Sequence, residues 1–191
     1  MEYLDICNEQ GLPTGAVVER DAAHRDGILH RTAHVWVIRK QNGEDQVLLQ
    51  KRSMAKESFP GAYDASSAGH IPAGDEPLVS ALRELREELG IRAEPDELTP
   101  IGTFRCRYER VFHRSLFRDN EVRFAFVYQK PVDSSTLTLQ KSEVDEVRWF
   151  SVEDVAAEIR VRQDRICVSE QGIRVLLDFL AGTQKEWTCK Q

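Results

Sequence analysis

Residues 69–91 read Gly69-His-Ile-Pro-Ala-Gly-Asp75-Glu-Pro77-Leu-Val-Ser-Ala-Leu-Arg83-Glu84-Leu85-Arg86-Glu87-Glu88-Leu89-Gly90-Ile91. From Asp75 onward, leucines recur at the period of an amphipathic α-helix, at Leu78, Leu82, Leu85 and Leu89. Asp75 is the expected N-cap, Pro77 suits the first turn, and Gly90 suits the end of the helix. The stretch therefore predicts a loop followed by a helix whose leucines enter a core.

The acidic residues of this helix form a face of their own. At 3.6 residues per turn, Glu84, Glu87 and Glu88 fall on one flank, away from the leucines, and we expect this flank to face solvent. Like charges four residues apart repel each other, and a divalent cation would remove that repulsion. Hard carboxylate oxygens suit Mg²⁺ or Mn²⁺, which also bind water and phosphate oxygens.

The segment resembles the Nudix box, G-x5-E-x7-R-E-U-x-E-E-x-G-U, in which U is a bulky aliphatic residue. The positions that match are Gly69, Arg83, Glu84, Leu85, Glu87, Glu88, Gly90 and Ile91. Asp75 stands where the box has Glu, so its side chain is shorter by one methylene group. Glycines, arginine and glutamates are all in register, which a merely solvated acidic helix does not explain.

The resemblance implies an α/β fold, the Nudix α/β/α sandwich with a mixed sheet, in one domain over residues 1–191. It also implies a metal-dependent hydrolase that cleaves a diphosphate linkage in a nucleoside diphosphate derivative or another small organic diphosphate. Mg²⁺ or Mn²⁺ is the implied cofactor, and a small-molecule diphosphate is the implied substrate.

The resemblance further assigns roles to side chains. Glu84, Glu87 and Glu88 are the implied metal ligands, and Glu87, Glu84 and Arg83 are the implied catalytic residues. Arg83 is expected to orient a glutamate through a paired hydrogen bond. The general base is either Glu87 or an acid outside the helix, for which Glu121 and Glu143 are candidates.

Beyond the box, the chain is similar to the isopentenyl-diphosphate-isomerase-like branch of the Nudix superfamily. Residues 5–15 resemble its opening hairpin, within an N-terminal extension over residues 1–31. The resemblance implies a second metal site made of His24, His30, His70, Asp119 and Glu121. Taken one by one, these histidines favour ordinary positions instead, His24 and His30 in loops and His70 in a turn.

Two departures separate this chain from the isomerases. The isomerases carry a catalytic cysteine directly before the Gly-His pair, where this chain has Ala68, and their Nudix box is degraded. The sequence therefore resembles the isomerase-like Nudix hydrolases, plant members among them, more than the isomerases. An isopentenyl-diphosphate isomerase and a non-catalytic ligand-binding Nudix module remain the alternatives.

Basic residues outside the box suggest contacts with an anionic substrate. Lys51 and Arg52 close an expected strand beside the box and are candidate diphosphate ligands. Residues 105–123 hold six arginines against three acids. This segment either steers an anionic substrate or protects an exposed hairpin from edge-to-edge association.

Secondary structure elsewhere follows from apolar alternation and turn residues. Strands are expected at 32–39 and 46–51, joined by a turn at Asn42-Gly43, and at 121–129 and 145–150. Ser151 and Ser169 are the expected N-caps of C-terminal helices, which lie within residues 151–182.

Composition limits the class of protein. With 191 residues, 41% of them hydrophobic, and a net charge of −6, the chain suits one globular domain and not a disordered segment or a basic binder of nucleic-acid polymers. No apolar run approaches the roughly 20 residues of a membrane span, and no secretory signal is expected. Cys7, Cys106, Cys167 and Cys189 form no C-x-x-C pair, which favours a reducing, cytoplasmic setting. A homodimer is common among similar proteins, and the sequence leaves the oligomeric state open.

Overall fold

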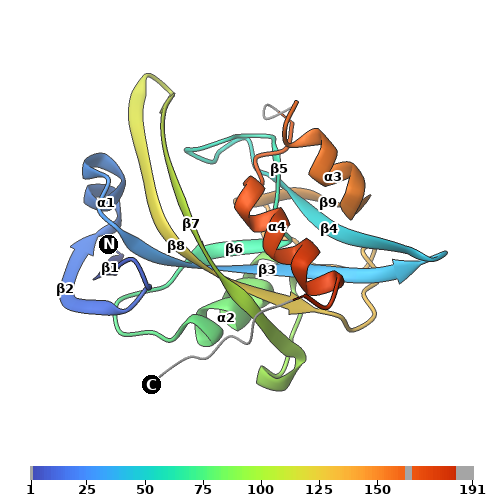
Figure 1. Cartoon of the computed structure of the whole chain (residues 1–191). Coiled ribbons are helices and arrows are strands. Elements are labelled where there is room, and N and C mark those ends of the chain that lie inside the picture. The colour runs from blue at the N-terminus through green and yellow to red at the C-terminus, as the bar shows by residue number, and fades with distance from the viewer. Residues whose placement is uncertain (1, 162–164, 184–191) are drawn as a thin grey trace.

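The computed structural model describes residues 2–161 and 165–183 (Figure 1). Its strands are β1 (Tyr3–Cys7), β2 (Pro13–Glu19), β3 (His30–Gln41), β4 (Glu44–Arg52), β5 (Tyr63–Asp64), β6 (Ser67–His70), β7 (Leu98–Phe112), β8 (Ser115–Tyr128) and β9 (Val144–Ser151). Its helices are α1 (Arg20–Asp26), α2 (Pro77–Leu89), the 3₁₀ turn η1 (Pro95–Glu97), α3 (Val152–Glu158) and α4 (Glu170–Leu180).

A mixed seven-stranded sheet forms the centre of the molecule. Its strand order is β5-β4-β3-β8-β7, with β6 also paired to β3 and β9 to β4. The β3–β8 pair is parallel, and the other pairs are antiparallel. Strands β1 and β2 form a separate two-stranded sheet near the N-terminus. The expected α/β sandwich with a mixed sheet is confirmed.

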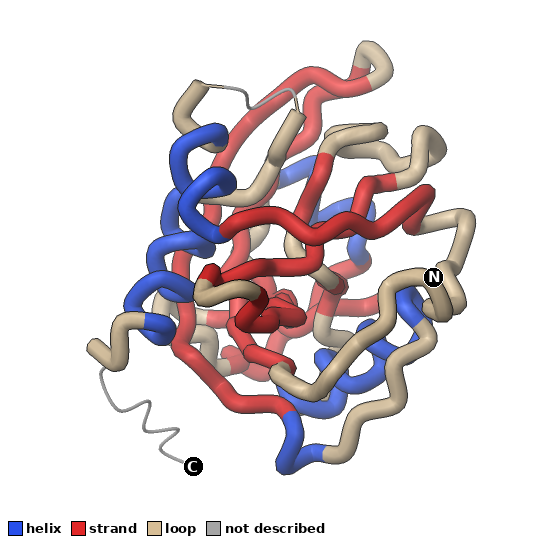
Figure 2. The backbone as a smooth tube through the Cα atoms, turned by 90° about the vertical axis from the view of Figure 1, so that its right-hand side faces the viewer, coloured by secondary structure: helices blue, strands red, loops and turns tan. Residues whose placement is uncertain are grey.

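Helices lie on both sides of the central sheet (Figure 2). On one face, Leu85 and Leu89 of α2 pack with Val35 and Val37 of β3. On the other face, α3 and α4 cover the side chains that alternate with these on the same strand, including Trp36. Two cores therefore share one sheet, as the period-two alternation of strand side chains requires.

The expected caps are confirmed except for one. Ser151 and Ser169 accept hydrogen bonds from backbone N–H groups in the first turns of α3 and α4. Gly90 ends α2 in the left-handed conformation, with a φ of 71°. The assignment of Asp75 as the N-cap of α2 is wrong: Pro77 is the first helical residue, so Glu76 occupies the cap position, and its side chain makes no capping bond.

The hairpin of β7 and β8 is much longer than the strand expected at 121–129. Its register runs from Leu98 opposite Tyr128 to Phe112 opposite Ser115. The two residues between the strands, His113 and Arg114, both have positive φ, as a two-residue turn of this type needs. The far end of the hairpin projects beyond the sheet (Figure 1).

Across the described residues, no helix combines the length and apolarity that a bilayer crossing needs. Cys7, Cys106 and Cys167 are free thiols. Cys189 lies outside the described residues.

Candidate active site and metal centres

A cavity of about 550 Å³ opens where α2, β6, the sheet and the β7–β8 hairpin meet. A volume of this size suits a small-molecule ligand. Among the described residues, the expected site residues that line it are His24, Arg52, His70, Arg83, Glu84, Glu87, Glu88, Asp119, Glu121 and Glu143. Lys51, a candidate substrate ligand, does not line it.

The acidic face of α2 is oriented by the opposite face of the same helix. Leu85 is fully buried in the core, which turns Glu84 toward β6. A Cβ atom at Gly69 would lie 2.2 Å from the Glu84 carboxyl carbon. Residue 69 must therefore be glycine for the Glu84 carboxylate to lie across the strand, which gives a physical reason for the first glycine of the motif.

Glu88 departs from the expected solvent-facing flank, and for this residue the expectation is wrong. Its side chain is buried and accepts hydrogen bonds from the Ala68 backbone N–H (3.0 Å) and from Gln50 Nε2 (3.3 Å). Strands β4 and β6 cover this side of α2, which the helical period alone does not reveal. Glu87, in contrast, is half exposed.

The glutamates of α2 have the electrostatics of a cation site. Burial raises the pKa of Glu84 to about 7 and that of Glu88 to about 8. Two desolvated carboxyl groups beside the exposed Glu87 disfavour full ionisation without a positive charge between them. A hard divalent cation would supply that charge, and carboxylate oxygens are its preferred ligands. The donor set therefore fits Mg²⁺ or Mn²⁺.

Arg83 connects this acidic face to β6. Its Nη2 lies 2.9 Å from Glu84 Oε1 and donates to the His70 carbonyl oxygen at 3.1 Å. Its Nη1 lies 3.5 Å from Glu87 Oε2. Arg83 thus orients two of the candidate metal ligands and not one.

The second cluster of expected ligands comes together through the parallel β3–β8 pair. His30 lies opposite Glu121 in the register, and Asp119 lies two residues before Glu121 on the same face of β8. α1 supplies His24, and β6 supplies His70 at its last residue. Residues up to 97 positions apart are therefore neighbours in space.

The geometry of these five side chains fits a metal ion. The Nε2 atoms of His24 and His70 are 3.0 Å apart, and His30 Nε2 is 3.5 Å from Glu121 Oε1. Ligand atoms lie within 4.8 Å of one another in two groups that share His30: His24, His30 and His70, and His30, Asp119 and Glu121.

Two observations indicate that these imidazoles are available as ligands. His24 Nδ1 and His30 Nε2 are buried and have no hydrogen-bond partner in the described part of the chain. Burial lowers the pKa of His24 to about 4 and that of His70 well below its usual value. The rings of His24 and His70 are therefore neutral near pH 7, the form that binds metals. The neighbouring Glu121 carboxylate raises the pKa of His30 in spite of its burial, so a metal there would have to displace a proton from this ring.

The comparison with protein families decides the identity of the fold. The model of the NUDIX domain matches residues 29–170. The chain belongs to the Nudix family.

Curated Nudix proteins lie close in sequence. The chain is 40% identical to Nudix hydrolase 3 of Arabidopsis thaliana over 155 residues, which are 80% of this chain but only 20% of that protein. It is 31% identical to the isopentenyl-diphosphate Δ-isomerase of Escherichia coli O127:H6, over 83% of this chain and 80% of the isomerase. Both branches that the sequence resembles are thus represented among its relatives.

Solved structures share the architecture. DR0079 from Deinococcus radiodurans superposes with a TM-score of 0.68 at 20% identity, covering 92% of this chain and 98% of that one. At this identity the likeness concerns the fold. Nudix hydrolases generally require a divalent metal. Among the described residues, the groups whose ligand atoms lie within 4.8 Å of one another come from the histidine cluster and not from α2.

The sequence did not single out Arg123, which holds both carboxylates of the histidine cluster. Its Nη2 lies 2.8 Å from Asp119 Oδ2, and its Nε lies 2.6 Å from Glu121 Oε2. The other oxygen of each carboxylate faces an imidazole, that of His24 or of His30. A guanidinium that is shared in this way orients the two acids toward the histidines.

Further cationic groups of this Nudix cavity come from β4 and the loop after it. Arg52 Nη1 lies 3.1 Å from Asp64 Oδ2, and Lys56 pairs with Glu143. The sequence did not single out Lys56 or Asp64, because neither stands in a motif.

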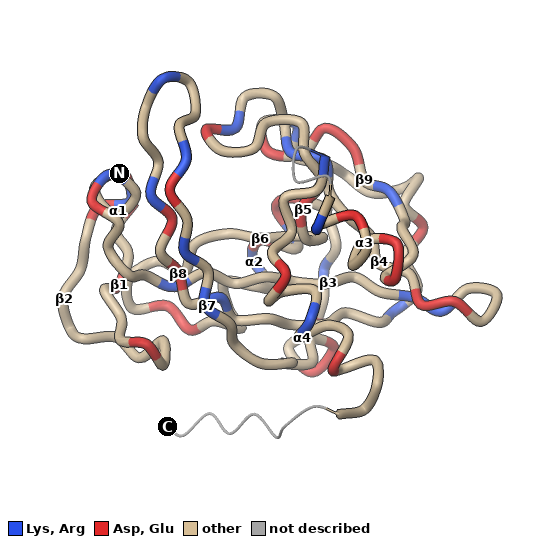
Figure 3. The backbone as a smooth tube through the Cα atoms, turned by 45° about the horizontal axis from the view of Figure 1, so that its top comes forward, with Lys and Arg blue, Asp and Glu red and all other residues tan. Residues whose placement is uncertain are grey.

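The arginine-rich hairpin contributes to the cavity at its inner part. Arg105, Arg107 and Arg110 line it, whereas Arg114 stands at the turn between β7 and β8. Figure 3 shows basic residues along this hairpin as far as its tip. Phe59, from the loop after β4, contacts Tyr108 and Phe112 of the hairpin, with ring centroids 5.5 and 5.0 Å apart. Substrate steering by residues 105–123 stays a prediction, and these three arginines are among those placed to contact a ligand in the cavity.

The buried ring of His34, on β3, predicts a loss of stability in acid. Burial, with the nearby charge of Arg123, lowers its pKa to about 4 from an ordinary value of 6.5. Between these values the unfolded chain binds a proton that the folded chain does not. We expect the free energy of unfolding to fall by up to about 3 kcal/mol as the pH drops from 6.5 to 4.

Urea unfolding at several pH values tests this expectation. His34→Phe should show a shallower dependence over the same range, because it removes the titrating ring and leaves the other acid-sensitive groups in place. Parallel pH profiles for the two proteins would contradict the assignment.

Proposed function

We propose that this chain, acting as a single Nudix domain, hydrolyses a diphosphate linkage in a nucleoside diphosphate derivative or another small organic diphosphate. The observation that carries this proposal is the acidic face of α2 turned into a cavity that also holds Arg52, Lys56 and the hairpin arginines. Carboxylates that bind a cation and cationic side chains that bind phosphate oxygens are the two requirements of diphosphate chemistry.

The proposed roles follow from the contacts of each side chain. Glu84, Glu87 and Glu88 hold Mg²⁺ or Mn²⁺, which when bound neutralises charge on the diphosphate oxygens. Arg83 fixes Glu84 and Glu87 in place. Arg52 neutralises further charge on the diphosphate. In the reaction, a water oxygen bonds to phosphorus, the P–O bond to the leaving phosphate breaks, and the proton of the water passes to a base.

Among the three candidates for the base, the contacts favour Glu87. Glu121 is engaged by Arg123, and it also accepts a hydrogen bond from Thr32 Oγ1 at 3.2 Å. Glu143 is paired with Lys56. Glu87 is half exposed, and its ion pair with Arg83 is 3.5 Å long, so it is the acid best placed to take a proton from water.

Product release with defined substrates tests the proposal. Purified protein with Mg²⁺ or Mn²⁺ is assayed for phosphate or nucleotide release from nucleotide sugars, dinucleotides and isoprenoid diphosphates. We expect metal-dependent release from at least one class. The absence of release from every class with either metal would contradict a hydrolase and favour a ligand-binding module.

The reaction type gives a separate prediction. Isomerisation of isopentenyl diphosphate needs an acid and a base on opposite faces of the alkene. Ala68 lines the cavity at the position of the isomerase thiol and supplies neither group. We expect no deuterium incorporation from D₂O into the allylic isomer, measured by mass spectrometry with an isomerase as positive control. Incorporation would overturn this interpretation.

We also propose that His24, His30, His70, Asp119 and Glu121 bind a second metal. Their mixed nitrogen and oxygen donors favour Mn²⁺ or Zn²⁺ over Mg²⁺. The site joins α1, β3, β6 and β8, so we expect chelation to lower the Tm by about 5 °C or more. Elemental analysis and melting with and without chelator measure this effect.

The variant His30→Ala should lose the response to chelator, and His113→Asn, at the exposed hairpin turn, should keep it. Asparagine suits the positive φ of residue 113, so this control leaves the turn intact. Purified protein without a tightly bound transition metal would contradict the second site and leave the proposal for α2 untouched.

A further inference from the structure

One face of the central sheet changes from apolar to polar part-way along its strands. On β3, Trp36 and Ile38 lie in the core under α3 and α4, whereas His34, next on the same face, lines the cavity. On β8, Val127 and Ala125 lie in that core, whereas Arg123 lines the cavity. The floor of the cavity is therefore a row of polar side chains that continues the core face.

His34 is the residue of this floor without a hydrogen-bonded partner. It is 5% exposed and borders Phe104, with ring centroids 6.0 Å apart. Within residues 2–161 and 165–183, neither of its ring nitrogens makes a hydrogen bond. The ring lines the cavity, and its nitrogens are not fully covered by other atoms, so a ligand in the cavity can reach them. A neutral imidazole offers one donor and one acceptor.

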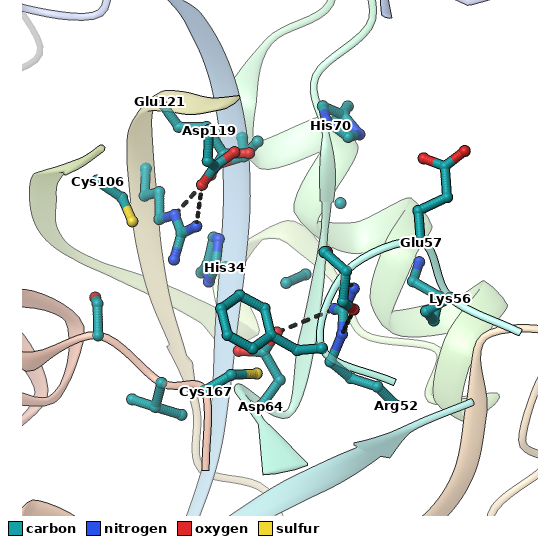
Figure 4. A pocket seen from close by; sticks show the side chains of 18 of the residues that line it. His34, Arg52, Lys56, Glu57, Asp64, His70, Cys106, Asp119, Glu121 and Cys167 are labelled. Atoms are coloured by element: carbon teal, nitrogen blue, oxygen red, sulfur yellow. Dashed lines mark hydrogen bonds and ion pairs between the residues drawn. The ribbon is translucent and has the colours of Figure 1, made fainter. Parts of the chain in front are cut away.

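Asp64 supplies a fixed acceptor on the same floor. One of its oxygens is held by Arg52 at 3.1 Å, and the other accepts the Ala65 backbone N–H at 2.8 Å. A carboxylate oxygen accepts more than one hydrogen bond, so both remain able to receive a donor from a ligand. In Figure 4, His34 lies between the Arg52–Asp64 pair and the acids Asp119 and Glu121.

Arg52 ties this floor to the proposed diphosphate site. The same guanidinium that holds Asp64 is the candidate diphosphate ligand, and Asp64 and His34 line the same cavity, so both would border a group attached to a diphosphate that Arg52 binds. A hydrocarbon chain there would displace water from both polar groups and replace none of its hydrogen bonds. A ring with hydroxyl or amide groups would replace them.

We propose that His34 and Asp64 form a subsite for a polar ring, hydroxylated or amide-bearing, attached to the diphosphate, and that this subsite discriminates against hydrocarbon groups. The proposal rests on the proposed function and names the class of substrate within it. Sugars and nucleobases share this chemistry. Isoprenoid diphosphates lack it.

Two diphosphate monoesters that differ in the organic group test the subsite. ADP carries a polar ring system, and isopentenyl diphosphate carries a hydrocarbon. With Mg²⁺ or Mn²⁺ we expect kcat/KM for ADP to exceed that for isopentenyl diphosphate at least tenfold. His34→Phe should lower this ratio at least tenfold through the KM of ADP, and the control His113→Asn should leave it unchanged. Ribose 5-diphosphate, which lacks the base, distinguishes sugar from base recognition.

Failure of the subsite can be distinguished from failure of the proposed hydrolase function. Equal or better turnover of isopentenyl diphosphate, or an unchanged ratio in a folded His34→Phe, overturns the subsite and leaves the hydrolase in place. If no compound is hydrolysed, the proposed function fails, and calorimetric binding of ADP and isopentenyl diphosphate with Ca²⁺ decides the subsite. Tighter binding of ADP that His34→Phe abolishes supports it, and equal binding overturns it. If His34→Phe does not fold, His34→Leu takes its place: its branched side chain offers neither a donor nor an acceptor.

Discussion

Replacing Glu87 with glutamine is expected to remove most of the activity and little of the stability. The substitution keeps the shape of the side chain and deletes one negative charge from the cation site. Glu87 is half exposed, and among the described residues its ion pair is with Arg83, so no cavity opens. Loss of a metal ligand that is also the proposed base should lower kcat by about 100-fold or more, a few kcal/mol of barrier.

The control is Glu153→Gln, an exposed glutamate in the first turn of α3, away from the cavity. It removes the same charge and should retain normal turnover. Glu88→Gln should lose activity as well, although its burial adds an effect on stability that Glu87→Gln lacks. Turnover close to that of the unchanged protein in both variants at saturating Mg²⁺ would contradict the assignment of ligands on α2.

Leu85→Ala is expected to have the largest effect on stability. Leu85 is fully buried between α2 and the sheet, in one core with Val35, Val37 and Leu89. Truncation leaves a cavity and should reduce the free energy of unfolding by about 2–5 kcal/mol. The measurement is urea unfolding, and the Tm should fall in parallel.

Val79→Ala is the matched control, because Val79 lies on the same helix and is 55% exposed. It should change the free energy of unfolding by less than about 0.5 kcal/mol. If Leu85→Ala melted like this control, the packing of α2 against the sheet would be wrong, and with it the orientation of the glutamates.

Local patterns were sufficient for much of the fold. The leucine period and Gly90 located α2, and the Asn42-Gly43 turn located the β3–β4 hairpin, where both residues have positive φ. Local patterns failed where tertiary contacts determine the secondary structure. The strand at 98–112 has weak alternation and was missed because it gains its regularity from pairing with β8. The short helix α1 was missed as well, since its seven residues carry no strong period.

The candidate site shows the same division. Motif spacing was sufficient to name the glutamates, and the resemblance named the histidine cluster, whose members the structure brings within reach of one another. The burial of each side chain could not be predicted from the sequence. Glu88, for example, is buried because β4 and β6 cover it.

Arg123 and His34 were missed for a related reason. Each is two or four residues along a strand from an expected ligand, Glu121 or His30, and so shares its face. That signal was present in the sequence, but it becomes readable only when β3 and β8 are known to be neighbours.

The parallel pairing of β3 with β8 also bears on how the molecule folds. The residues that it joins, such as His30 and Glu121, are 91 positions apart, whereas the β3–β4 and β7–β8 hairpins close over short loops. Closing a long loop costs more chain entropy, so contacts of this kind form slowly. We therefore expect the two hairpins to form before β3 pairs with β8. The histidine–carboxylate cluster, which depends on that pairing, should be completed late. Metal uptake there would report on chains that have finished folding.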